Sequence, residues 1–163
     1  MKSIPPGAWL GLLGGGQLGR MFCMAAQSLG YKVVVLDPGG DSPAGSVADR
    51  HIRTDYLDPQ GLADLATLAS AATTEFENVP ATALEFLART ARVTPSAASV
   101  AIAQDRISEK MFLAGHAFAV TPFAVLRSLD DARGVDERLL PGIVKSARLG
   151  YDGKGQTSVN SRA

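Results

Sequence analysis

The feature that most constrains this sequence is a glycine-rich segment between a strand-like run and a helix-like run. Residues 8–13 are mostly apolar, and they lead into the segment Leu13–Gly19, Leu-Gly-Gly-Gly-Gln-Leu-Gly. The pattern predicts a helix over 17–29 and a β-branched strand over 31–36, which ends at Asp37. One β-turn-α-β unit therefore opens the chain, and its strands should be parallel with a right-handed connection.

The predicted helix over 17–29 carries apolar side chains at helical spacing. These residues recur on one face of the helix: Leu18, Met21, Phe22, Ala25 and Leu29.

The rest of the chain continues to alternate between strands and helices, so the fold class is α/β. We expect a Rossmann-like domain with a parallel sheet over 1–117, followed by the start of a second domain over 118–163. In the second part, strands are predicted over 123–126 and 143–146, with a charged, partly helical segment over 130–138 between them.

The overall composition excludes some classes of function. The chain is 46% hydrophobic and has a formal net charge of +0, which argues against binding to nucleic acid or to a membrane surface. Cys23 is the only cysteine in the sequence, so it cannot form an internal disulfide and is expected to be a small buried hydrophobic residue. The N-terminal residues resemble neither a signal peptide nor a membrane span, and a cytoplasmic setting is expected.

The first glycine segment has the spacing of a phosphate-binding turn. Gly14, Gly16 and Gly19 fit G-x-G-x-x-G, and the N-terminus of the following helix offers free N–H donors to a phosphate. Asp37 lies where dinucleotide-binding proteins keep the acid that binds ribose. An NAD-dependent oxidoreductase therefore remains open, as does a turn with only a structural role.

Two carboxylates, Glu75 and Glu77, lie at the C-terminal end of a predicted strand, just before a helix that begins at Pro80. In open α/β sheets ligands bind at that edge. A carboxylate there is suited to accept a hydrogen bond from a ribose hydroxyl or an amine. The alternative is that both acids only complement the dipole of the helix.

A second glycine-rich segment, Gly150–Gln156, reads Gly-Tyr-Asp-Gly-Lys-Gly-Gln and follows a strand that carries Lys145. Such a loop can close its N–H groups over phosphates, while the lysine supplies a fixed charge. Arg106, which follows Asp105 near a predicted helix start, is a further candidate cation. The alternatives are a β-hairpin connection for the loop and a solvated helical charge for Arg106.

Five segments together carry a resemblance to a known family. They are Leu13–Met21, Val35–Pro38, Glu75–Pro80, Ala103–Arg106 with Glu109–Lys110, and Gly150–Gln156. In this order they closely resemble the 5-(carboxyamino)imidazole ribonucleotide synthases of purine biosynthesis, ATP-grasp ligases once called the ATPase subunit of phosphoribosylaminoimidazole carboxylase. The resemblance implies a Rossmann-like pre-ATP-grasp domain followed by the beginning of an ATP-grasp domain.

The resemblance also implies an activity and its ligands. ATP and bicarbonate would form carboxyphosphate, which would carboxylate the amine of aminoimidazole ribonucleotide. Magnesium is implied as cofactor, and a homodimer as the full-length assembly. The implied ribonucleotide-binding residues are Gly15, Gly16, Gln17, Leu18 and Glu75. The implied ATP-binding residues are Arg106, Lys145, Gly150, Tyr151, Asp152, Gly153, Lys154, Gly155 and Gln156, and Asp152 and Lys154 are also implied to be catalytic.

Members of that family are much longer than this chain. Their acidic magnesium ligands are implied to lie outside these residues, so no metal ligand is expected here. The chain is therefore expected to be a fragment or a truncated product that is inactive alone. Another ATP-grasp relative, such as the formate-dependent glycinamide ribonucleotide transformylase, and a non-catalytic binding fragment remain open.

Overall fold

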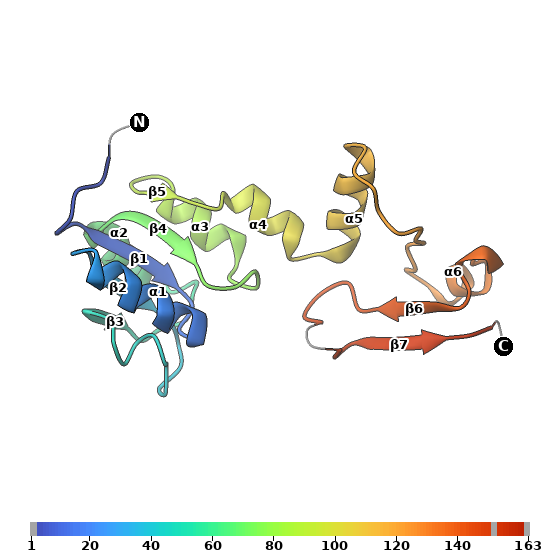
Figure 1. Ribbon diagram of the computed structural model, residues 1–163, viewed down its shortest axis with the longest axis horizontal. Helices are drawn as coiled ribbons and strands as arrows, with labels where there is room; N and C mark the ends of the chain where they lie inside the picture. Colours follow the sequence, from blue (N-terminus) through green and yellow to red (C-terminus); the bar gives the residue numbers. More distant parts are fainter. Residues whose placement is uncertain (1–2, 151–152, 162–163) are drawn as a thin grey trace. The chain divides into compact units, whose positions relative to one another are not determined.

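The computed structural model describes residues 3–150 and 153–161, and the chain divides into two compact units (Figure 1). Unit 1 is Met1–Ala101 and unit 2 is Ile102–Ala163, and helix α4 (Ala97–Ala103) spans the division. The sequence placed the boundary after residue 117. In the structure helix α5 (Arg106–Gly115) lies in unit 2.

Unit 1 is built on a five-stranded sheet with the order β3-β2-β1-β4-β5, in which every pairing is parallel. The strands are β1 (Trp9–Leu13), β2 (Lys32–Leu36), β3 (Arg50–Ile52), β4 (Ala69–Thr74) and β5 (Arg92–Val93). The predicted α/β fold with a parallel sheet is confirmed. Because β1 lies in the centre, its C-terminal end meets the ends of β2 and β4 at one edge.

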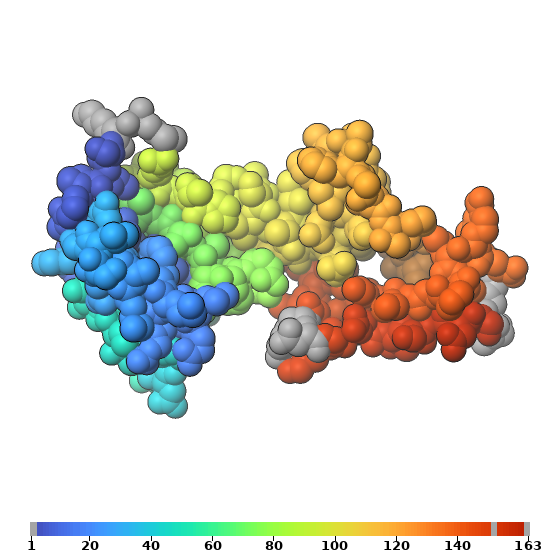
Figure 2. All heavy atoms as spheres, in the orientation of Figure 1, coloured from blue at the N-terminus to red at the C-terminus, as the bar shows by residue number. Residues whose placement is uncertain are grey.

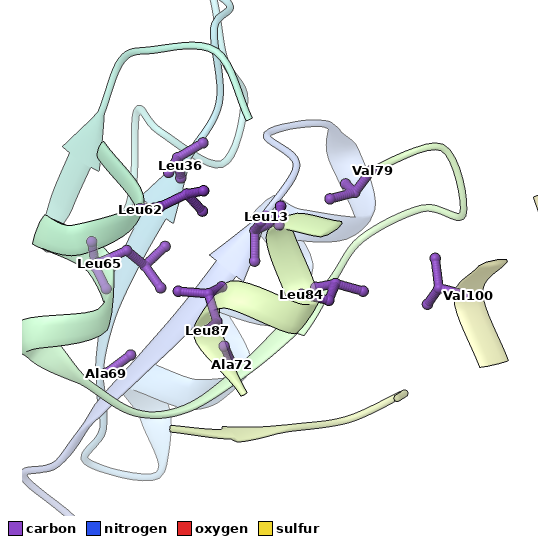
Figure 3. Packing of buried hydrophobic residues seen from close by; sticks show 12 residues of the cluster. Leu13, Leu36, Leu62, Leu65, Ala69, Ala72, Val79, Leu84, Leu87 and Val100 are labelled. Carbon is purple, nitrogen blue, oxygen red and sulfur yellow. The ribbon is translucent and has the colours of Figure 1, made fainter. Parts of the chain in front are cut away.

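Helices cover both faces of this sheet. They are α1 (Gln17–Ser28), α2 (Pro59–Leu68) and α3 (Ala81–Leu87). Successive residues of β2 point to opposite faces. Val33 and Val35 pack with α1, whereas Val34 and Leu36 join the larger cluster that includes side chains of α2 and α3 (Figure 3). A fully buried leucine of this cluster contributes about 1.5–3 kcal/mol to folding.

The face of α1 that packs on the sheet is not the apolar face found in the sequence. Its buried residues are Gly19, Cys23 and Ala26. Leu18 and Met21 are 66% and 65% exposed, and of the apolar face found in the sequence only Phe22 packs against the core. Small residues face the sheet because the helix lies close to it: a Cβ on Gly19 would lie 3.0 Å from Leu12 Cδ2. The exposed side chains of α1 lie at the surface, in the blue region of Figure 2.

Unit 2 contains an antiparallel hairpin of β6 (Gly142–Lys145) and β7 (Gln156–Val159), with α5, α6 (Leu129–Arg133) and the 3₁₀ helix η1 (Glu137–Leu139). The strand predicted over 143–146 is thus present. The strand predicted over 123–126 is absent, because no described segment pairs with its backbone. Gln104 is the only buried residue in the described part of this unit, so unit 2 has no buried apolar core there.

Candidate functional site

The turn between β1 and α1 needs glycine for both conformation and space. Gly14 has a φ of +105°, and a Cβ there would lie 2.8 Å from Glu75 Cβ. Its N–H donates to the carbonyl of Leu36 at 3.1 Å, which ties the turn to the end of β2. Three strand ends therefore meet at this turn, since Glu75 follows β4 and donates its own N–H to Leu13 at 2.9 Å. The sheet brings together segments that are far apart in the chain.

The carboxylate of Glu75 lies on the N-terminus of α1. Gly16 N–H donates to its Oε2 at 2.5 Å, and Gly19 N–H donates to its Oε1 at 3.1 Å. These amides are among the donors at a helix start that have no partner within the helix. Glu75 thus satisfies two of them from a position 59 residues away from Gly16. The carboxylate also complements the positive end of the helix dipole.

Two further donors of the same helix start have no partner within the described part of the chain. Among the residues that the structure describes, the N–H groups of Gln17 and Leu18 have no acceptor, and both residues are exposed. Free N–H groups at a positive helix end form an anion site. The predicted ribonucleotide-binding residues Gly15, Gly16, Gln17, Leu18 and Glu75 are therefore brought together at one edge of the sheet.

A loop that sequence reasoning did not single out supports the turn from the other side. Ser42 is 6% exposed, and its hydroxyl donates to the carbonyl of Gly15 at 3.0 Å. Ala44 N–H donates to the same carbonyl at 2.9 Å. A Cβ on Gly15 would overlap the hydroxyl of Ser42, so this glycine is required for close packing. The only sequence signal was the proline- and glycine-rich composition of 38–47, which does not identify Ser42.

Asp37 lies next to the turn, but both of its carboxylate oxygens already accept hydrogen bonds. Tyr56 donates to Oδ2 at 2.7 Å, and the N–H of Gly39 donates to Oδ1 at 2.8 Å. Burial first, and then this bond to Asp37, raise the pKa of the Tyr56 phenol above its usual range. Asp37 therefore acts here as a fixed point for its own loop, and this engagement does not favour the role of a dinucleotide-binding acid.

Unit 2 holds a second cluster of predicted residues around a cleft of about 220 Å³. The cleft is lined by Arg106, Lys145, Ser146, Gly150, Gly153, Lys154, Gly155 and Gln156. It therefore contains all of the predicted ATP-binding residues except Tyr151 and Asp152, which lie outside the described residues. The loop connects β6 to β7, so the hairpin alternative describes its local structure correctly.

Two backbone contacts hold this cleft together. Arg106 N–H donates to the carbonyl of Ala147 at 2.9 Å, and Ser146 N–H donates to the carbonyl of Gly155 at 2.7 Å. Asp105 caps α5 by accepting from the N–H groups of Ile107 and Ser108, and these bonds, that of Ser108 foremost, lower the pKa of Asp105. The cap starts the helix immediately before Arg106. Cations and glycine amides around a small cleft are suited to bind phosphate groups.

Neither a metal site nor a membrane span is found in the described part of the chain. No group of three or more His, Cys, Asp or Glu side chains there is placed to hold a metal ion. None of the described helices has the length and apolar character needed to cross a membrane.

A family model described as the ribonucleotide synthetase preATP-grasp domain matches residues 8–104. The chain belongs to this family. The match covers the sheet of unit 1, both carboxylates at the end of β4 and the whole glycine turn.

Individual relatives match nearly the whole chain. The N5-carboxyaminoimidazole ribonucleotide synthase of Brucella melitensis is 45% identical over 163 residues, and that of Bacillus subtilis is 38% identical over 161 residues. Each match covers 98% of this chain, but only 44% and 42% of the respective relatives. The chain therefore spans less than half of the length of these relatives.

Two solved structures are similar in fold and carry informative ligands. The Staphylococcus aureus N5-carboxyaminoimidazole synthetase complexed with ADP has a TM-score of 0.89 and 38% identity, covering 99% of this chain and 43% of that chain. The Aspergillus clavatus N5-carboxyaminoimidazole synthase in complex with ADP and 5-aminoimidazole ribonucleotide has a TM-score of 0.81 and 29% identity, covering 95% and 41%.

Proposed function

We propose that this chain contributes the ribonucleotide-binding domain and the start of the ATP-binding domain of an N5-carboxyaminoimidazole ribonucleotide synthase. The reaction is the ATP-dependent transfer of the carboxyl group of bicarbonate to the amine of 5-aminoimidazole ribonucleotide, a step of purine biosynthesis. The observation that carries the proposal is the glycine turn beside Glu75, whose Gln17 and Leu18 amides have no acceptor among the described residues, in a chain that resembles a synthase complexed with that ribonucleotide.

In this proposal unit 1 holds the ribonucleotide. The N–H groups of Gln17 and Leu18 bind its 5′-phosphate, since they lie at the positive end of α1 and no described residue accepts from them. Gly15 and Gly16 allow the phosphate to approach the backbone closely. Glu75 accepts hydrogen bonds from the ribose or imidazole part of the ligand.

Unit 2 holds the phosphates of ATP in the same proposal. Arg106 and Lys145 supply positive charge at the cleft, and the loop Gly150–Gln156 covers the phosphates. Asp152 and Lys154 are proposed to face bicarbonate and the amine, although Asp152 lies outside the described residues. A covering loop is useful because the mixed anhydride formed from ATP and bicarbonate reacts with water.

The proposal extends to the cofactor and the setting. Magnesium would neutralise charge on the ATP phosphates, but the described residues offer no cluster that fits it, so we assign no magnesium ligand among them. We propose a cytoplasmic location and a homodimer for the synthase as a whole.

A titration of the ¹⁵N-labelled chain tests the ribonucleotide site. We expect 5-aminoimidazole ribonucleotide to shift the amide resonances of Gln17 and Leu18 in a saturable way, while NAD at equal concentration leaves them in place. Saturable shifts with NAD and none with the ribonucleotide would replace the proposal with a dinucleotide-binding function.

A further inference from the structure

The two hydrogen bonds of Glu75 have a consequence for how an anion enters the site. The carboxylate of Glu75 accepts hydrogen bonds from the amides of Gly16 and Gly19 at the start of α1. The amides of Gln17 and Leu18, which lie between them in the sequence, have no acceptor among the described residues. The helix start is therefore half filled by an anion that belongs to the chain itself.

A phosphate dianion cannot be added to this arrangement without conflict. Bound to Gln17 and Leu18, it would lie within one helical turn of the Glu75 carboxylate. Like charges at that separation repel appreciably even near a protein surface. The amides of Gly16 and Gly19 would also be unavailable to the phosphate, although they belong to the same set of donors at the helix start.

We propose that Glu75 is a specificity-determining residue that competes with the ligand's phosphate for the amides of Gly16 and Gly19, and this rests on the proposed ribonucleotide site. A phosphate that binds displaces the carboxylate from both amides. The displaced carboxylate is left without partners, so it needs hydroxyl or amine donors on the same ligand. A phosphorylated ribose supplies both a phosphate for the amides and hydroxyl donors for the carboxylate, whereas free phosphate supplies only the phosphate.

The geometry supports displacement over a permanent cap. Glu75 is on the segment that leaves β4, and it is only partly buried, so its carboxylate lies within reach of a ligand that approaches from solvent. Its place also favours selectivity, because the cost of leaving the amides is recovered only by a ligand with donors near its phosphate. The site thereby prefers sugar phosphates to the inorganic phosphate of the cell.

Binding of two probes, inorganic phosphate and ribose 5-phosphate, tests this inference on the full chain. In Glu75→Gln the charge that competes with phosphate is gone, and we expect inorganic phosphate to bind about tenfold more tightly than in the wild type. Ribose 5-phosphate should gain less or lose affinity, since its hydroxyls lose a charged acceptor. The dissociation constant of inorganic phosphate divided by that of ribose 5-phosphate should therefore fall by about tenfold.

Two companion variants control the measurement. Glu77→Gln removes the same charge two residues away, from a side chain that accepts from Asn78, and should leave the ratio as it is in the wild type. Glu75→Asp keeps the charge but is one methylene shorter, so it should hold the two amides less well and lower the ratio in the same direction as Glu75→Gln.

Amide resonances distinguish competition by Glu75 from a merely structural role of this residue. In the wild type, ribose 5-phosphate should shift Gly16 and Gly19 together with Gln17 and Leu18, because all four amides change or gain an acceptor. If phosphate affinity is the same in the wild type and in both Glu75 variants while ribose 5-phosphate still shifts Gln17 and Leu18, competition is refuted and the proposed site stands. If neither probe shifts these amides in the wild type, the phosphate site itself is wrong, and the inference is overturned with it.

Discussion

Tyr56 donates a hydrogen bond of 2.7 Å to the carboxylate of Asp37, and this bond connects the end of β2 to the segment before α2. The ring of Tyr56 also packs edge-on against Phe76, with 6.2 Å between the ring centroids. Phe76 immediately follows Glu75, so the three loops at this edge of the sheet support one another. The acid that the sequence suggested as a ribose ligand is thereby part of the scaffold.

Removing the hydroxyl of Tyr56 should destabilise the fold. A hydrogen bond to a charged acceptor is worth more than one to a neutral carbonyl, so we expect Tyr56→Phe to lower the free energy of unfolding by about 1–2 kcal/mol in urea titrations. Tyr31→Phe is the matched control, because Tyr31 donates at 2.8 Å to the neutral carbonyl of Ile4. It should cost only about 0.5–1 kcal/mol. Equal losses of unfolding free energy in the two variants would contradict the expectation that the charged Asp37 acceptor makes the stronger hydrogen bond.

A side chain at Gly14 should be costlier than one at another glycine of similar conformation. Gly14 and Gly7 have φ values of +105° and +89°, but a Cβ on Gly7 would meet nothing within 4 Å. We expect Gly7→Ala to cost about 1 kcal/mol of stability for its backbone and Gly14→Ala at least about 2 kcal/mol, because it also displaces Glu75. Thermal unfolding of both variants measures the difference, and an equal cost would mean that the turn yields to the added methyl group.

Cys23 should make stability fall at alkaline pH. Burial first, and then the charge of Asp49, raise the pKa of its thiol from 9.0 to about 11. Below pH 9 the thiol is protonated in both states, so its contribution is complete. As the pH rises from 9 to 11, the unfolded state ionises first, and the free energy of unfolding should fall by on the order of 1 kcal/mol per pH unit.

The matched experiment compares the wild type with Cys23→Ala by urea denaturation across this range. The variant starts less stable because it leaves a small cavity, but it should lose less stability than the wild type as the pH rises. Parallel curves for the two proteins would show that the thiol does not ionise on unfolding. A thiol reagent at pH 8 offers a second check, since it should modify the folded chain only slowly.

The cleft of unit 2 should need its lysine for nucleotide binding. Lys145→Met keeps most of the side chain's apolar length but removes one positive charge, and we expect the affinity for ADP to fall about five- to tenfold in calorimetric titrations. Lys110→Met is the control, because Lys110 lies over the ring of Phe123 and does not line the cleft. A similar loss in both variants would indicate a general effect of charge instead of a local contact.

The two units should differ in local stability. Leu12, Leu13 and all residues from Val33 to Leu36 are at most 1% exposed, whereas Ile143 and Val144 of β6 are 59% and 46% exposed. Because apolar burial is the main source of protection, amides of β1 and β2 should exchange hydrogen at least about a hundredfold more slowly than those of β6 and β7. Hydrogen exchange followed by mass spectrometry measures this, and equal protection would contradict the distribution of burial.

Local patterns were sufficient for the framework of the candidate site. The glycine turn, the β-branched strand over 31–36 and the helix start near Arg106 depend on neighbours a few residues apart, and each is found close to its predicted place. The convergence of Arg106 and Lys145 on the second glycine loop was also expected from the resemblance. The face of α1 was not, because apolar spacing identifies a stripe but not whether a sheet lies close enough to demand small residues instead.

The sequence by itself determined an α/β chain with a glycine turn at the start of its first helix. Conformational preference and hydrophobic periodicity depend on residues that are close together in the sequence. Only the tertiary structure decided what the turn contacts. Gly16 and Glu75 are 59 residues apart, and the parallel pairing of β1 with β4 brings them to one edge. The acid predicted to bind a ligand therefore lies on the amides of the turn, because side-chain partners across a sheet depend on register and depth that no local pattern specifies.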